Sequence, residues 1–159
     1  TRRLDAAGVP WDVTPGVPAY AAAAAIVGRE LTVPLLAQSV VLTRTQARST
    51  AMPESESLAA FAATGSTLVL HLAITRTAEL MDQITPFYGA ECPVAVVSRA
   101  SQPEEQVLRG TVATIGDLVA RAGLRQAAVI LVGPALASSS DAESYLYSTA
   151  RVQRKAQLR

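Results

Sequence analysis

The stretch Thr67-Leu68-Val69-Leu70-His71-Leu72 decides the fold class of this chain. It is a short apolar run with no helical spacing, which is typical of a buried β-strand. A helical pattern follows over residues 75–88 and ends at Gly89. Residues 93–98 then form a second apolar run of strand length. Because short β-rich runs alternate with longer helical patterns, the sequence predicts an α/β protein.

The flanking sequence extends this alternation on both sides. Residues 39–43 indicate a strand, and residues 55–64 indicate a helix that ends at Gly65. Glu54, Ser55 and Ser57 are all able to cap that helix, and the spacing does not choose among them.

The chain after residue 100 continues the same pattern. Residues 105–114 alternate around Gly110, and residues 115–122 indicate a helix that ends at Gly123. Residues 128–132 indicate a last strand. The sequence therefore predicts about five strands, enough for one sheet with helices on its faces.

The first part of the chain suggests that a longer protein precedes it. Residues 1–7 resemble the last turns of a helix, with Gly8 at the position of a left-handed C-terminal cap. Residues 9–13 indicate a short strand that ends in a turn. Pro18 suits the first position of a helix, and the alanine-rich residues 19–27 continue that helix. We therefore expect the chain to begin inside an element and to be the C-terminal portion of a longer protein.

Composition excludes several classes of protein. The 159 residues include 14 Lys and Arg against 13 Asp and Glu, so a net charge of +1 provides no general attraction for nucleic acid. Half of the residues are hydrophobic, which excludes a disordered chain. Cys92 is the single cysteine, so a disulfide framework is impossible and a reducing cytoplasm is expected. The apolar runs are shorter than the roughly 20 residues of a membrane span, so no membrane insertion is expected.

Few residues in the sequence carry obvious catalytic chemistry. One histidine and one cysteine cannot form a zinc site by themselves, so no metal is expected. Neither a Gly-x-Ser-x-Gly elbow nor a nucleotide-binding glycine motif is present. His71 lies inside an apolar strand, where a structural or pocket-wall role is more common than a role as catalytic base.

Two turns are candidates for contact with a ligand. Residues 14–19 join the expected strand to the alanine-rich helix and expose backbone N–H groups at its start. An ordinary strand-to-helix turn explains them equally well. Gly110 and Thr111 follow an apolar strand, where glycine either admits a ligand or marks a bulge.

Four segments, in this order and spacing, resemble the S-adenosylmethionine-dependent tetrapyrrole methylases. They are VTPGVPA at 13–19, TLVLHL at 67–72, PVAVVSRASQP at 93–103 and QVLRGT at 106–111. Three further segments resemble the branch that methylates carbon 11 of precorrin-4: GRELTVP at 28–34, VLTR at 41–44 and SYLYS at 144–148.

The resemblance implies a particular domain organisation. The family has two α/β domains with the cofactor between them, and it forms homodimers. Its N-terminal Gly-Pro-Gly-Asp and Gly-Asp-Pro segments are not in this sequence. Residues 1–17 would then be the end of the N-terminal domain, including its last strand and the interdomain turn. Residues 18–140 would be the C-terminal domain with a mixed five-stranded sheet, and residues 141–159 a polar, basic tail.

The resemblance also implies a binding site for S-adenosylmethionine. Its cofactor-binding residues would be Pro15, Gly16, Pro18, Ala19, Leu72, Gly110 and Thr111. Leu72 replaces a common methionine and keeps an apolar contact. Pro18 has no N–H, so any family contact through that amide must be replaced. The bends at Gly16, Leu72 and Gly110 are expected to line one wall of a common groove.

The expected function is methyl transfer from S-adenosylmethionine to carbon 11 of precorrin-4, giving precorrin-5 in cobalamin biosynthesis. The tetrapyrrole carries carboxylates, and arginine pairs with carboxylate through two hydrogen bonds. The candidate substrate-binding residues are Arg44, Arg48, Arg76 and Arg99. His71 is a weak candidate for a catalytic base. Two alternatives stay open, namely a sister methylase that acts on another ring carbon and a non-catalytic dimerisation or binding module.

Overall fold

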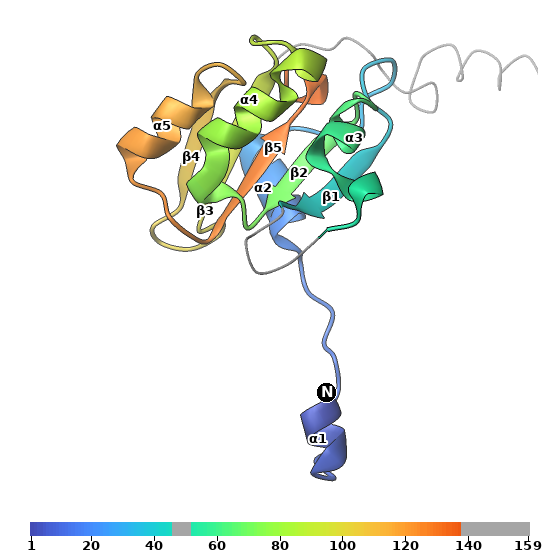
Figure 1. The fold of residues 1–159 in the computed structure, drawn as a ribbon. Helices are drawn as coiled ribbons and strands as arrows, with labels where there is room; N and C mark the ends of the chain where they lie inside the picture. The colour runs from blue at the N-terminus through green and yellow to red at the C-terminus, as the bar shows by residue number, and fades with distance from the viewer. Residues whose placement is uncertain (46–51, 138–159) are drawn as a thin grey trace, which may run out of the picture.

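The computed structural model describes residues 1–45 and 52–137, and its five strands form one mixed sheet (Figure 1). The strands are β1 (Val40–Arg44), β2 (Thr67–His71), β3 (Pro93–Ser98), β4 (Gln106–Thr111) and β5 (Ala128–Val132). Their order across the sheet is β1-β2-β5-β3-β4. β1 and β2 are parallel, whereas the other neighbouring pairs are antiparallel.

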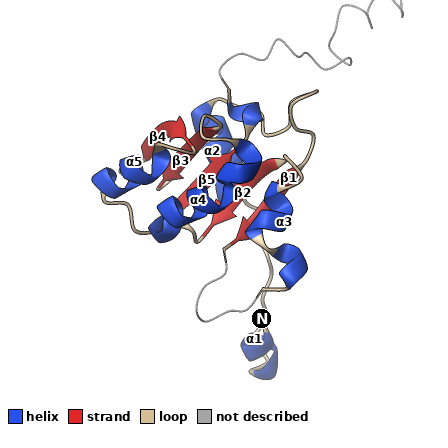
Figure 2. Cartoon of the chain, turned by 45° about the horizontal axis from the view of Figure 1, so that its top comes forward, coloured by secondary structure: helices blue, strands red, loops and turns tan. Residues whose placement is uncertain are grey.

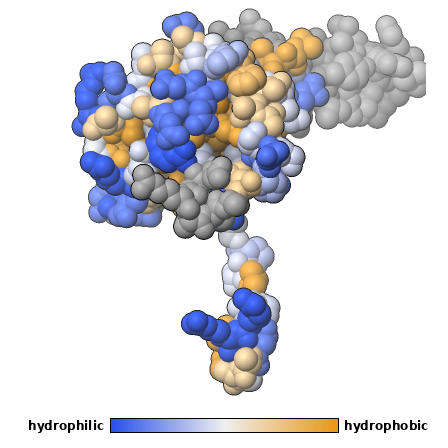
Figure 3. All heavy atoms as spheres, viewed as in Figure 1, coloured by the Kyte–Doolittle hydropathy of each residue, from blue (hydrophilic) through white to orange (hydrophobic). Residues whose placement is uncertain are grey.

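Helices cover both faces of the sheet (Figure 2). α2 (Ala19–Val27) packs on one face, against β3 and β5. The opposite face carries α3 (Leu58–Ala62), α4 (Thr77–Tyr88) and α5 (Ile115–Ala122). Short 3₁₀ turns occupy Glu54–Glu56, Ile74–Arg76 and Pro134–Leu136. Hydrophilic side chains cover the outer surface of α4 (Figure 3), so its buried side is the one that faces the sheet.

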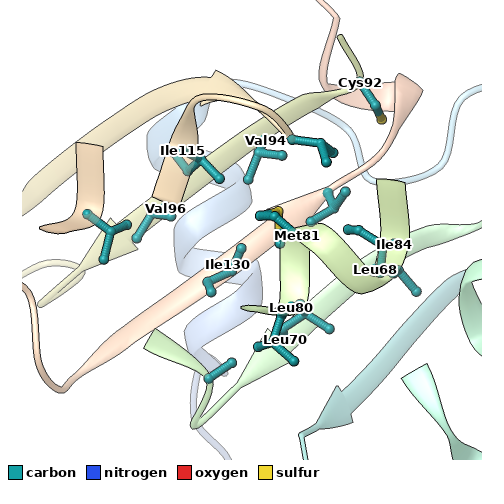
Figure 4. Packing of buried hydrophobic residues seen from close by; sticks show 14 of the residues in the cluster. Leu68, Leu70, Leu80, Met81, Ile84, Cys92, Val94, Val96, Ile115 and Ile130 are labelled. Atoms are coloured by element: carbon teal, nitrogen blue, oxygen red, sulfur yellow. The ribbon is translucent and has the colours of Figure 1, made fainter. Parts of the chain in front are cut away.

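The central strands β2, β3 and β5 are mostly apolar because the sheet is covered on both sides. Leu68 and Leu70 of β2 point into the core beneath α4 and α5, while Val69 between them belongs to the core beneath α2. β3 and β5 alternate in the same way, and Figure 4 shows Val96 and Ile130 of these strands in the larger core. The period of two thus divides each strand between two cores.

Most of the predicted elements are confirmed. β3, α5 and β5 have the predicted bounds, and the other strands and helices in the described part of the chain shift by a few residues. α2 covers the predicted residues 19–27, but Pro18 is its N-cap with an extended backbone and not its first helical residue. The helix α1 (Arg2–Ala6) is also present, and Gly8 after it has the expected left-handed backbone, with φ +64°.

The predicted strand over residues 9–13 is wrong. These residues are exposed, and no described strand pairs with them. A strand needs a neighbour to satisfy its backbone groups, and residues 9–18 instead form an extended connection between α1 and the body of the fold (Figure 1).

The structure selects one of the three possible caps of α3. The N–H of Ala60 donates a hydrogen bond to Oγ of Ser57 at 3.2 Å. Ser57 is therefore the N-cap, and Ser55 lies in the preceding 3₁₀ turn.

We expect Ser57→Ala to lower the free energy of unfolding by about 1 kcal/mol, because a helix N–H loses its partner. Ser55→Ala is the matched control and should change it by less than about 0.5 kcal/mol. Urea unfolding followed by circular dichroism measures both. Equal losses for the two variants would contradict this cap assignment.

Candidate functional site

A large cavity lies at the end of the sheet where β2 and β3 end and β5 begins. Its volume is about 940 Å³, and we call it the first cavity. This end of the sheet is at the bottom in Figure 1, on the side of the connecting segment that leads to α1. The walls come from α2, from residues 71–75 after β2, from residues 99–102 after β3 and from residues 125–129 at the start of β5.

The cavity wall is largely apolar. Ala19, Ala22 and Ala25 of α2 line it, and their small side chains leave the space open. Val17 and Leu72 also line it, and both side chains are 79% exposed. Exposed apolar side chains beside a cavity provide a surface that an apolar part of a ligand can cover.

Backbone strain is concentrated around this cavity. Five described residues other than glycine have a positive φ, and four of them line the first cavity. These four are Leu72 (φ 55°), Arg99 (φ 49°), Ser101 (φ 62°) and Ala127 (φ 53°). The left-handed region is unfavourable for such side chains, and strain of this kind gathers at binding sites.

Hydrogen bonds hold two of these strained segments together. The N–H of Arg99 donates to the carbonyl of Ala127 at 2.8 Å and thus connects the end of β3 to the start of β5. The guanidinium of Arg99 also donates to Glu104 at 3.3 Å. The backbone of the turn after β3 is therefore tied to the start of β5, whereas the pair with Glu104 joins two exposed side chains of the same loop.

The charged groups that line the first cavity are of one sign. Arg99 and Arg125 line it, with the imidazole of His71 beside them, and no Asp or Glu is among its lining residues. A cavity with apolar walls and cationic groups fits a ligand that has an apolar body and acidic groups.

The structure brings together only some of the predicted cofactor residues. Ala19 and Leu72 line the first cavity. Pro15, Gly16 and Pro18 are exposed in the segment that leads to it, and they are not among its lining residues.

Gly110 and Thr111 lie elsewhere, so the expected common wall of Gly16, Leu72 and Gly110 is wrong. Both residues are inside β4 and pair with Val94 and Pro93 at the start of β3, the opposite end of the sheet from Leu72. Gly110 lines a separate cavity of about 430 Å³. A Cβ on Gly110 would lie 2.8 Å from Oγ1 of Thr114, so close packing against the following turn explains this glycine.

The predicted substrate arginines are also divided. Arg99 lines the first cavity, whereas Arg44 and Arg76 line a second cavity of about 560 Å³ between the end of β1, α3 and α4. Arg76 pairs with Glu79, and their hydrogen bond raises the pKa of Arg76 and lowers that of Glu79. Arg48 lies outside the described residues.

The single histidine and the single cysteine add little catalytic or metal-binding chemistry to the first cavity. His71 is half-buried at the end of β2 and lines the first cavity, next to Leu72. Cys92 is buried near the opposite sheet edge, and burial raises the pKa of its thiol to about 11, which keeps it protonated at neutral pH. The described residues contain no group of three potential metal ligands. Nor does any helix among them have the length and apolar character needed to cross a membrane.

Sequence reasoning missed several residues that line the first cavity, namely Ser101, Gln102, Arg125, Gln126 and Ala127. Ser101 and Ala127 adopt backbone conformations that usually require glycine, so the sequence gives no sign of the turns they form. A signal was available for Ser101 and Gln102, because they belong to the segment 93–103 that resembles the family.

Comparisons with known proteins identify the family of this chain. The sequence model of the Tetrapyrrole (Corrin/Porphyrin) Methylases matches residues 1–116. A precorrin-4 C(11)-methyltransferase from Sinorhizobium sp. is 51% identical over 96% of this chain. The chain spans 60% of the length of that relative.

Solved structures show the same fold. A cobalt precorrin-4 methyltransferase, described as a cobalamin biosynthetic enzyme, matches 86% of this chain and 57% of its own with a TM-score of 0.79 and 37% identity. The uroporphyrin-III C-methyltransferase of Thermus thermophilus, solved with S-adenosylhomocysteine, matches 84% of this chain and 57% of its own with a TM-score of 0.61 and 25% identity. This chain belongs to the tetrapyrrole (corrin/porphyrin) methylase family.

Proposed function

We propose that the protein to which this chain belongs transfers a methyl group from S-adenosylmethionine to carbon 11 of precorrin-4, in the biosynthesis of cobalamin. The observation that carries the proposal is the first cavity, which lies at the strand ends of a methylase fold and is lined by strained turns. The relative with 51% identity is named for precorrin-4, whereas the structure with 37% identity is named for its cobalt form. This difference favours the metal-free substrate.

The first cavity fits S-adenosylmethionine in size and character. Its volume of about 940 Å³ lies in the range of cavities that hold drug-sized ligands. Val17, Ala19 and Leu72 provide apolar surface for the adenosine, and the turn at residues 99–102 provides backbone groups for hydrogen bonds. Because no carboxylate lines the cavity, the donor's own carboxylate meets no repulsion there.

The chain's contribution to catalysis is positioning. S-adenosylmethionine supplies a methyl group on a positively charged sulfur, which is reactive without a metal. A bound ligand would cover the apolar wall around Leu72 and so keep water from the reacting atoms, and the strained turns shape the site before a ligand binds. Holding two reactants at attack distance contributes up to roughly 7–11 kcal/mol. This accounts for the absence of an evident acid–base pair among the residues that line the cavity.

The carboxylates of the tetrapyrrole would bind to arginines. The arginines that we propose for this role are Arg99, which lines the first cavity, and Arg44, which lines the second. His71 stays a weak candidate for accepting a proton. The proposal also includes a cytoplasmic homodimer in which residues 1–17 end an N-terminal methylase domain and residues 18–140 form the C-terminal domain.

The position of methylation tests the proposal directly. The full-length protein, incubated with precorrin-4 and S-adenosylmethionine labelled with ¹³C in the methyl group, should give one labelled methyl at carbon 11, detected by NMR. Label at another ring carbon would indicate a sister methylase. The non-catalytic alternative would give no labelled product and no binding of S-adenosylhomocysteine.

Leu72→Asp should weaken binding of S-adenosylhomocysteine to the full-length protein by at least about tenfold, because it places a carboxylate against an apolar part of the ligand. Isothermal titration calorimetry measures the Kd. Leu35→Asp is the matched control, since Leu35 also has a positive φ, is 93% exposed and does not line the first cavity. Unchanged affinity of the Leu72 variant would remove Leu72 from the donor site.

Arg44→Ala should raise the KM for precorrin-4 about tenfold through the loss of a charge-assisted pair. The Kd for S-adenosylhomocysteine should stay within about twofold, because Arg44 lies in a different cavity from the donor. Arg121→Ala on the exposed surface of α5 is the control, and steady-state kinetics measures all three proteins. An unchanged KM would exclude Arg44 from the substrate site.

A further inference from the structure

The segment between β3 and β4 contains two successive turns, and only the first lines the first cavity. In the first turn, the N–H of Gln102 donates to the carbonyl of Arg99 at 2.9 Å. In the second, the N–H of Glu105 donates to the carbonyl of Gln102 at 3.0 Å. Residues 99–102 line the cavity, whereas Pro103, Glu104 and Glu105 do not.

The first turn places serine where glycine is usual. Its central residues are Ala100 and Ser101, of which only Ser101 has a positive φ. This combination is that of a type II turn, whose third position strongly favours glycine. Arg99 before it also has a positive φ, so two of four consecutive residues are in unfavourable conformations. Other interactions must hold this turn in place.

Glu105 supplies such an interaction. The backbone N–H of Ser101 donates a hydrogen bond to Oε2 of Glu105 at 2.7 Å, which is short for a bond of this kind and has a charged acceptor. The bond crosses from the second turn to Ser101, the central residue of the first turn that has a positive φ. It fixes the peptide group before Ser101, which belongs to the cavity wall.

We propose that Glu105 is a positioning residue for the donor site: its carboxylate holds the turn at residues 99–102 in the shape that lines the first cavity, without lining the cavity itself. This inference rests on the proposed function, because it takes S-adenosylmethionine as the ligand of that cavity. The neighbouring Glu104 has a different role, since its carboxylate pairs with the guanidinium of Arg99 and accepts no backbone N–H.

The experiment compares variants of the full-length protein by titration with S-adenosylhomocysteine. Glu105→Met keeps the length of the side chain but removes the acceptor oxygen, and the Kd should rise about fivefold. Glu105→Gln keeps an acceptor oxygen, and Glu104→Met removes a carboxylate of the same loop. Both of these Kd values should stay within about twofold of the unchanged protein.

A kinetic readout separates positioning from general stability. Glu105→Met should raise the KM for S-adenosylmethionine while kcat at saturation and the thermal unfolding midpoint change little. Glu105→Ala serves as the second variant if the methionine variant does not fold.

If the unchanged protein binds S-adenosylhomocysteine and Glu105→Met binds it equally well, the positioning role is wrong while the proposed function stands. A Glu105→Gln variant as weak as Glu105→Met would also overturn it. Failure of the unchanged protein to bind would refute the proposed donor site itself.

Discussion

The antiparallel insertion of β5 between β2 and β3 is the constraint on which the rest of the structure depends. β5 runs antiparallel to both neighbours, and its register pairs His71 with Val129 and Ser98 with Ala128. β2 and β3 therefore run in the same direction and end at the same end of the sheet. The turn after β2, the turn after β3 and the start of β5 therefore lie together at that end of the sheet. The first cavity exists because these three segments meet there and α2, with its small side chains, covers the adjoining face.

The same constraint accounts for the strain at the site. Leu72, Arg99, Ser101 and Ala127 all lie where the chain leaves or enters the central strands, and each has left-handed backbone geometry. Such geometry costs on the order of 1 kcal/mol per residue. It is maintained because the strands on one side of each turn are mostly buried and hydrogen-bonded. A site that is shaped in advance loses less conformational entropy when a ligand binds.

The sequence was sufficient for the fold but only partly sufficient for the site. Strands and helices were predictable because runs such as residues 67–71 and 128–132 are mostly apolar and of strand length. Residues 9–13 also contain apolar side chains yet pair with no described strand, since pairing depends on a neighbour that local sequence does not reveal. Leu72 and Ala19 line one cavity, and their contact with the cofactor stays a prediction. Gly110 was not, because a glycine that allows close helix packing looks the same in sequence as one that faces a ligand. Positive φ at Ser101 and Ala127 follows from the hairpin and the sheet register rather than from their side chains.

The most direct test of this account is a crystal structure of the full-length protein with S-adenosylhomocysteine. We expect the ligand at the edge where β2 and β3 end, in contact with Leu72 and with the turn at residues 99–102. Ligand bound instead at the opposite end of the sheet, beside Gly110 and the start of β3, would contradict it.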